Sequence, residues 1–276
     1  MSVIDSETRK TMIRNTFDTV CEGYDSPALR FFHNAAAHLP EMFSLSGDES
    51  ILDVATGTGT PALALAPRVP RGRITAVDFS AGMLSQGRDK AGKLGIGNIE
   101  FLDMDMTDLR VPDGSFDAAN CSFGVFFTED MVATVRHIVS KLKAGATMVT
   151  CHFREGSMVP LNQLFLDRVQ AYGVDVPPIG WRRVGSEQAN RELFAAAGLD
   201  QVRVEHRSVG YFLDHPERWW DVVWWAGYRG LLDNFDSATL QRFKTEHLAE
   251  VTATAEAEGI PMPVDVMYTV GVKPMQ

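Results

Sequence analysis

The sequence predicts a doubly wound α/β fold, with helices on both faces of a mostly parallel sheet. The first observation is the segment 51–66, in which an apolar run breaks at Gly57 and Gly59 and continues as an alanine- and leucine-rich helical pattern. A strand, a glycine turn and a helix in that order form a mononucleotide-binding corner. The second observation is that short strand patterns alternate with helical patterns as far as residue 153, which is typical of a parallel sheet.

The composition excludes several classes of function. The 276 residues suffice for one large domain or for a domain with an inserted cap. A net charge of −10 disfavours a nucleic-acid partner. The sequence has neither a signal peptide nor an apolar stretch of membrane-spanning length, so we expect a cytoplasmic protein. Three distant cysteines and seven scattered histidines predict reduced thiols and no bound metal.

Two helices are expected before the first strand. Residues 6–20 have helical spacing, and Gly23 can end that helix. Tyr24 and Asp25 follow in a turn, and residues 29–43 suggest a second helix, which carries His33. We therefore predict three parts of the chain, namely N-terminal cap helices at 1–45, a cofactor-binding core at 46–153, and the rest of the core sheet with cap insertions at 154–276.

The core strands are expected at residues 50–55, 73–79, 98–104, 116–122 and 146–153. Asp78 ends the second of these strands, where a carboxylate can accept both hydroxyl groups of a ribose. Ser80 is the expected N-cap of the helix that follows. Ligands of open α/β sheets bind at the carboxyl ends of the strands, so Ser122 and Phe123 should also border the site.

The glycine spacing alone leaves two kinds of ligand open. Gly57-x-Gly59-x-x-Ala62 fits the relaxed dinucleotide fingerprint, with Asp78 about twenty residues further on. Additional carboxylates at Asp53 and Asp105 would repel a pyrophosphate, whereas they would attract a ligand that carries an ammonium and a sulfonium group. S-adenosylmethionine is such a ligand.

Four segments carry a resemblance to a known family, namely LDVATGTG, AVDFSAGML, EFLDMDMTDLRVPDGSFD and SFG. In this order they resemble a class I S-adenosylmethionine-dependent methyltransferase, most closely the ubiquinone/menaquinone-biosynthesis group. The similarity covers roughly residues 13–153 and includes the entry segment IRNTFDTVCEGYD. It implies a Rossmann-like, mostly parallel seven-stranded sheet with an antiparallel final hairpin and a helical cap, and S-adenosylmethionine as the cofactor.

The resemblance also implies the contacts of the cofactor. Tyr24 would close over it, Asp105 would accept a hydrogen bond from the adenine amino group, and the backbone N–H of Met106 would meet a ring nitrogen. Met83 is expected to pack against the adenine. The full predicted cofactor set is Tyr24, Asp53, Ala55, Thr56, Gly57, Gly59, Asp78, Phe79, Met83, Asp105, Met106, Ser122 and Phe123.

One departure from the family bears on the acceptor. His152 stands where the quinone-pathway enzymes typically carry a carboxylate, which argues against carrying the quinone substrate over to this chain. Because histidine titrates near neutral pH and this one ends a strand, His152 is the first candidate for a general base and His33 the second. The alternative for His152 is a buried, hydrogen-bonded histidine.

The second half of the chain is expected to add substrate-facing insertions at about 154–186 and 211–262, a sixth strand at 202–209 and an edge strand at 267–272. The second insertion has a helical pattern in which an aromatic stripe occupies one face and Trp219 points roughly opposite. Such a stripe is more often core, but its rings can also line an apolar pocket. The predicted acceptor contacts are Phe127, Trp181, Trp220, Trp224 and Tyr228.

The predicted reaction is in-line transfer of a methyl group from sulfur to an O, N, S or C nucleophile of a small aromatic or apolar acceptor. Two other classes stay open at this stage. One is a nucleotide-dependent oxidoreductase that uses the same glycine corner, and the other is a non-catalytic cofactor-binding protein. The sequence is compatible with a monomer or a homodimer.

Overall fold

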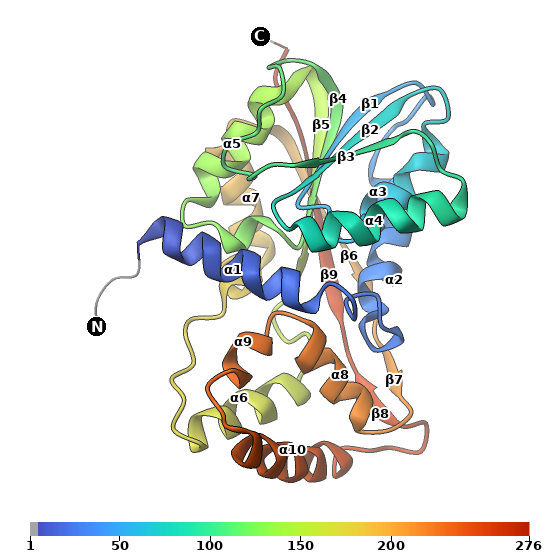
Figure 1. The fold of residues 1–276 in the computed structure, drawn as a ribbon. Helices are drawn as coiled ribbons and strands as arrows, with labels where there is room; N and C mark the ends of the chain where they lie inside the picture. Colours follow the sequence, from blue (N-terminus) through green and yellow to red (C-terminus); the bar gives the residue numbers. More distant parts are fainter. Residues whose placement is uncertain (1–4, 276) are drawn as a thin grey trace.

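The computed structural model describes residues 5–275, so residues 1–4 of the predicted N-terminal cap and Gln276 lie outside the described residues. A seven-stranded sheet with helices on both faces forms the upper body in Figure 1, and a group of helices lies below it. None of the helices within residues 5–275 combines the length and the apolar character needed to cross a membrane.

The sheet has the strand order β3-β2-β1-β4-β5-β9-β6. The strands are β1 Ser50–Val54, β2 Arg73–Asp78, β3 Ile99–Asp103, β4 Phe116–Ser122, β5 Leu142–Phe153, β6 Asp200–Ser208 and β9 Asp265–Val272. The first five pair in parallel, and β9 runs antiparallel to both of its neighbours. The predicted doubly wound, mostly parallel seven-stranded sheet is confirmed. The strand order reverses between β1 and β4, where such sheets bind their ligands.

The predicted position of the last strand is wrong. Residues 267–272 were expected at the edge of the sheet, but β9 lies between β5 and β6. Residues 266–272 (VMYTVGV) are mostly apolar, and residues 266–271 are all buried, whereas an edge strand tends to alternate with polar residues. The edge position belongs to β6, which carries several charged residues and is mostly partly or fully exposed.

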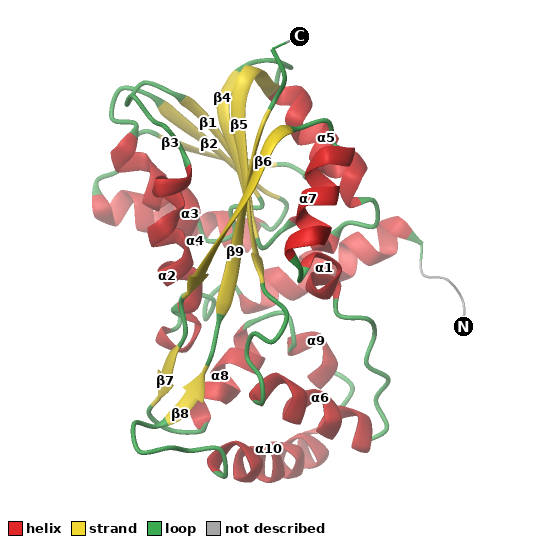
Figure 2. Cartoon of the chain, turned by 180° about the vertical axis from the view of Figure 1, so that it is seen from behind, coloured by secondary structure: helices red, strands yellow, loops and turns green. Residues whose placement is uncertain are grey.

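Helices cover the two faces of the sheet unequally (Figure 2). Most buried apolar residues of α2 Phe31–His38, α3 Thr60–Leu65 and α4 Ala81–Leu94 join one core cluster, and those of α5 Met131–Lys141 and α7 Glu187–Ala196 join another. Met83 of α4 belongs to a third, smaller cluster. The predicted N-cap is present, since the Ser80 side chain accepts a hydrogen bond from the Met83 N–H. The helix expected at 29–43 is interrupted, because Pro40 has no backbone N–H to continue the helical hydrogen bonds, and Leu39, which keeps helical backbone, begins a 3₁₀ turn. The short 3₁₀ turns are η1 Pro27–Leu29, η2 Leu39–Met42, η3 Ala66–Arg68, η4 Val125–Phe127 and η5 Gly180–Val184.

A helical cap lies beyond the lower end of β9. It consists of α6 Leu161–Ala171, β7 Tyr211–Leu213, α8 Glu217–Trp225, α9 Arg229–Leu232, α10 Ser237–Thr252 and β8 Ile260–Met262. The expected all-helical second insertion therefore begins with a short strand, β7, which pairs with β8. The expected aromatic stripe is also divided, because Ala226 has extended backbone and ends α8 directly after Trp225.

Candidate active site

A pocket of about 400 Å³ opens at the carboxyl ends of the parallel strands. This volume is typical of sites for small molecules, which measure about 300–1,000 Å³. The walls come from the segments after β1, β2, β3 and β4, and from helix α1 Ser6–Val20. The sequence-predicted residues that line it are Tyr24, Ala55, Thr56, Gly57, Asp78, Phe79, Met83, Asp105, Met106, Ser122, Phe123 and Phe127.

The two glycines of the turn after β1 face different surroundings. Both have left-handed backbone, with φ of +55° at Gly57 and +79° at Gly59. A Cβ atom at Gly57 would meet no atom within 4 Å, so the space beside it is free for a ligand. A Cβ atom at Gly59 would lie 2.9 Å from the ring of Phe101. Gly57 therefore faces the pocket, whereas Gly59 lies outside the pocket wall and allows close packing behind it.

Asp78 connects the end of β2 to the glycine turn. Its two carboxylate oxygens accept hydrogen bonds of 2.9 Å from the backbone N–H groups of Gly57 and Ser80. Burial raises the pKa of Asp78 to about 6, although these hydrogen bonds favour its charged form. The carboxylate is thus ionised at neutral pH and lines the pocket, as a ribose-binding acid must.

Asp53 is fully buried and does not line the pocket, contrary to its prediction as a cofactor contact. It accepts hydrogen bonds from the Thr56 hydroxyl at 2.5 Å and from the Asn120 amide at 2.6 Å. Burial raises its pKa to about 6. Asp53 therefore connects the glycine turn to β4 from outside the pocket. Its partner Thr56 is the residue of this pair that lines the pocket.

Asp105 also lines the pocket and has a partner that the sequence did not indicate. The Lys10 ammonium on α1 is 2.9 Å from one carboxylate oxygen, and Thr107 donates two hydrogen bonds of 2.8 Å to the other. Burial raises the pKa of Asp105, but these hydrogen bonds outweigh it and leave the pKa below its ordinary value. Asp105 therefore joins helix α1 to the pocket.

Helix α1 forms one wall of the pocket through its inward-facing residues, which are Ser6, Arg9, Lys10, Ile13 and Phe17. Besides the Lys10–Asp105 pair, Asp18 accepts hydrogen bonds from the Ser80 hydroxyl at 2.5 Å and from the Gly82 N–H at 3.1 Å. These contacts join residues more than sixty positions apart, so the helical periodicity of residues 6–20 gave no sign of them.

Aromatic rings that line the pocket pack against one another. Tyr24 is stacked on Phe32 with 5.1 Å between ring centroids, and Phe32 meets Phe123 edge-on at 5.1 Å. Phe17 and Phe127 meet edge-on at 5.2 Å. All five rings line the pocket. Of these, Phe17 and Phe32 were not identified as site residues from the sequence.

Asp25 is a further site residue that was not predicted from the sequence. It lines the pocket and accepts a hydrogen bond of 2.9 Å from Thr58 in the glycine turn. The Lys90 ammonium lies 2.8 Å from its other oxygen. His33, the second candidate base, is 3.6 Å from Asp25 but is not itself part of the lining, and burial lowers its pKa.

The structure does not bring His152 into the pocket. Its imidazole is completely buried on the face of β5 opposite Cys151 and Phe153, 5.9 Å from the ring of Phe126. Neither ring nitrogen has a hydrogen-bond partner among the described residues, and burial lowers the pKa of His152 to about 3. These observations argue against His152 as a general base. It is the buried histidine of the alternative interpretation, but it lacks the expected hydrogen bond.

Four of the five predicted acceptor contacts also lie outside the pocket, and only Phe127 lines it. Trp181 packs edge-on against Phe153 at 5.9 Å. The other three, Trp220, Trp224 and Tyr228, pack within the helical cap and contact the rings of Phe165 and Phe243 or one another. A stripe on a cap helix is buried against the neighbouring helices, so the interpretation as core applies to it.

The burial of His152 predicts a pH effect on stability. Its folded-state pKa of about 3 lies below the unfolded value of about 6.5, so the unfolded chain takes up the proton first as pH falls. The stability associated with neutral His152 is therefore complete above pH 6.5 and is lost as pH falls toward 3. We expect His152→Leu to lose less stability on acidification than the wild type, as measured by thermal unfolding between pH 7.5 and pH 4. A parallel decline in the two proteins would contradict this account, and His38→Leu, at a partly exposed position, is the control.

Comparisons with known proteins extend the observations on the pocket. A family model described as a methyltransferase domain matches residues 51–145. The chain is 28% identical over 183 residues to the ubiquinone/menaquinone biosynthesis C-methyltransferase of Bdellovibrio bacteriovorus. The aligned region covers 64% of this chain and 76% of that protein. It is 24% identical over 232 residues to the demethylmenaquinone methyltransferase of Listeria monocytogenes, covering 76% and 96% of the two chains.

A solved structure shares the fold. The YcgJ protein from Bacillus subtilis superposes with a TM-score of 0.58 at 18% identity, over 88% of this chain and 99% of that one. The matched domain contains the glycine turn, Asp78 and Asp105, which are the parts of the pocket that the sequence motifs indicated. Together, the matched domain, the similar enzymes and the seven-stranded fold support a class I S-adenosylmethionine-dependent methyltransferase.

Proposed function

We propose that the protein transfers a methyl group from S-adenosylmethionine to a small aromatic acceptor, and that the 400 Å³ pocket is where the cofactor binds. The observation that carries the proposal is that carboxylates and aromatic rings line one pocket at the carboxyl ends of the strands. Asp78 is hydrogen-bonded to the glycine turn, and Asp105 is paired with Lys10 on α1. Carboxylates can accept hydrogen bonds from the ribose and the adenine, and aromatic faces favour a cationic sulfonium.

The residues present fit the cofactor. The open space beside Gly57 lets a ligand approach the backbone closely, and the ionised Asp78 can accept hydrogen bonds from ribose hydroxyls. The faces of Tyr24, Phe32 and Phe123 favour a cationic sulfur and exclude water from it. The bound cofactor supplies an activated methyl group, and the work of this chain is to align the acceptor with it at about 3 Å.

The acceptor class follows from the rings and from the relatives. The similar enzymes are named for C-methylation in ubiquinone/menaquinone biosynthesis and for demethylmenaquinone methylation, which supports an aromatic ring as the acceptor. The substitution of a carboxylate by His152 does not speak against such a ring, because His152 lies outside the pocket. Asp25 lines the pocket directly after Tyr24 in the chain, and we propose it as the group that orients an acceptor hydroxyl.

Calorimetric titration and a turnover assay test the proposal. We expect S-adenosylmethionine and S-adenosylhomocysteine to bind and NAD not to bind. Among a hydroquinone, a catechol, a thiol and a primary amine of similar size, the hydroquinone or the catechol should be methylated. Binding of NAD alone would overturn the cofactor assignment, and turnover of only the thiol or the amine would overturn the acceptor class.

The raised pKa of Asp78 predicts the pH dependence of cofactor binding. The charged carboxylate is the better hydrogen-bond acceptor, so affinity for S-adenosylhomocysteine should be full above pH 7 and should weaken as pH falls through about 6. Hydrogen bonds to a charged group contribute about 1.5–3 kcal/mol. Asp78→Asn should therefore bind about tenfold or more weakly at pH 7.5 and should lose most of the pH dependence.

Asp53→Asn is the matched control for Asp78→Asn, because Asp53 has a similarly raised pKa but does not line the pocket. The dissociation constant of Asp53→Asn for S-adenosylhomocysteine at pH 7.5 should differ less from the wild-type value than that of Asp78→Asn. Equal affinities of Asp78→Asn and the wild type, measured by calorimetry on folded protein, would contradict the ribose assignment.

A further inference from the structure

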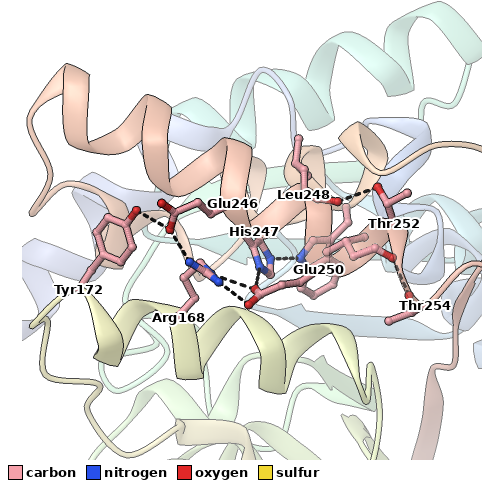
Figure 3. A network of polar contacts seen from close by, with 10 residues as sticks. Arg168, Tyr172, Glu246, His247, Leu248, Glu250, Thr252 and Thr254 are labelled. Atoms are coloured by element: carbon pink, nitrogen blue, oxygen red, sulfur yellow. Dashed lines mark hydrogen bonds and ion pairs between the residues drawn. The ribbon is translucent and has the colours of Figure 1, made fainter.

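The helices of the cap are joined to one another by polar contacts (Figure 3). Arg168 on α6 pairs with Glu246 and Glu250 on α10, and one of its hydrogen bonds to Glu250 measures 2.9 Å. His247 on α10 is fully buried and accepts a hydrogen bond of 2.8 Å from the indole N–H of Trp219 on α8. Helices α6, α8 and α10 are thus linked through these side chains.

Trp225, the last residue of α8, reaches out of the cap. Its ring packs against the main core and also against a separate small cluster, which is formed by Val20, Cys21 and Met83 with Phe17 and Tyr24 packed around it. Met83, Phe17 and Tyr24 line the pocket. The ring of Trp225 therefore joins the cap to the side chains directly behind the pocket wall.

Gly23 shows how close this contact is. A Cβ atom at Gly23 would lie 2.0 Å from Cδ2 of Trp225, and within 2.5 Å of two further atoms of the same ring. Such distances are far below van der Waals contact, so an alanine at position 23 requires the indole or the backbone to move. The φ angle of Gly23 is not in the left-handed region, so the indole, and not backbone strain, is the reason for a glycine here.

The residues after Gly23 form the pocket wall. Tyr24 stacks on Phe32, and Asp25 bonds to Thr58 in the glycine turn. Trp225 therefore contacts the backbone directly before both wall residues. Helix α1 precedes Gly23 and carries Lys10, so its end is also in contact with the cap.

We propose, on the basis of the proposed cofactor pocket, that Trp225 is a positioning residue that places Tyr24 and Asp25 against the cofactor and couples the helical cap to cofactor binding. By thermodynamic linkage, the position of the cap affects cofactor affinity as much as cofactor binding affects the position of the cap. A displacement of Trp225 should weaken cofactor binding, and a bound cofactor should hold Trp225 and the cap in place.

A double-mutant cycle on Gly23 and Trp225 tests this coupling through the dissociation constant of S-adenosylhomocysteine. Gly23→Ala alone should weaken binding about tenfold, because the added methyl group displaces the indole from its place, and Trp225→Ala should weaken it similarly. In the Trp225→Ala background, Gly23→Ala should change the affinity less than twofold, since the group it would displace is gone. Such non-additivity is expected only for residues that act through one contact.

Gly92→Ala is the matched control, since a Cβ atom there meets nothing within 4 Å, and it should bind like the wild type. Melting temperatures of all variants are measured without ligand to detect a general loss of stability. Such a loss would lower the melting temperature, but it would not make the two substitutions non-additive in affinity. Wild-type affinity of Gly23→Ala, or a full tenfold effect in the Trp225→Ala background, would overturn the positioning role. A failure of the wild type to bind S-adenosylhomocysteine would instead overturn the proposed function.

Discussion

Gly57→Val is expected to lower the affinity for S-adenosylmethionine by at least about a hundredfold while the fold persists. The φ angle of +55° is strained for a β-branched residue, at a cost of about 1–3 kcal/mol. The valine side chain would also occupy the free space beside the turn, where the cofactor must approach the backbone. The measurement is calorimetric titration with S-adenosylhomocysteine, together with circular dichroism of the same sample.

Gly114→Val provides a matched control for Gly57→Val. Gly114 has a φ angle of +63° and open space around its Cβ position, but it precedes β4 at the opposite end of the sheet. This substitution should therefore introduce similar backbone strain without filling the pocket. If both variants lost affinity equally, strain and not contact with the ligand would explain the result at Gly57.

Trp219→Ala is expected to cause the largest loss of stability in the cap. The indole is fully buried, and truncation of a buried aromatic side chain to alanine typically costs about 3–5 kcal/mol. The substitution also leaves the buried Nε2 of His247 without its donor, which adds a desolvation cost. The free energy of unfolding, measured by urea titration, should fall accordingly.

Two further variants separate these contributions. Trp219→Phe fills most of the volume but cannot donate to His247, so its loss should lie between those of the wild type and the alanine variant. Trp224→Ala removes a partly exposed ring that contacts Trp220 and Arg229, and should cost clearly less. An equal loss in the two alanine variants would contradict the placement of Trp219 as the deeper ring.

The parts of the site that could be predicted from the sequence are those encoded by short contiguous motifs. The glycine turn and Asp78 are adjacent to strands whose apolar patterns are clear, so their place at the carboxyl ends of the sheet follows from local sequence. Lys10 and Asp25 could not be found in this way. Each acquires its role from a partner far along the chain, Asp105 for the first and Lys90 for the second, and a charge on a helix or in a turn is usually solvated.

His152 and Trp219 show a second reason for failure. Both faces of β5 are covered, so its sequence does not say which residues point toward the pocket and which point into the opposite core. For Trp219, the helical pattern correctly separated two faces of α8, but both faces are packed in the cap. The interior place of β9 was also missed, although residues 266–272 (VMYTVGV) form a nearly continuous apolar run, which is more typical of a buried strand than of a sheet edge.

The position of β9 inside the sheet also determines how late in synthesis the sheet can be completed. Seven residues of β5, from Thr147 to Phe153, pair with β9 residues that are more than a hundred positions further along the chain. While the ribosome is still making residues 154–264, the edge of β5 has no partner from β9, and an unpaired apolar strand edge is prone to aggregate. We therefore expect a fragment that ends before residue 265 to be poorly soluble and to recover when a peptide of residues 265–272 is supplied. In the nascent chain, the edge of β5 that pairs with β9 is covered only after residues 265–272 have been made.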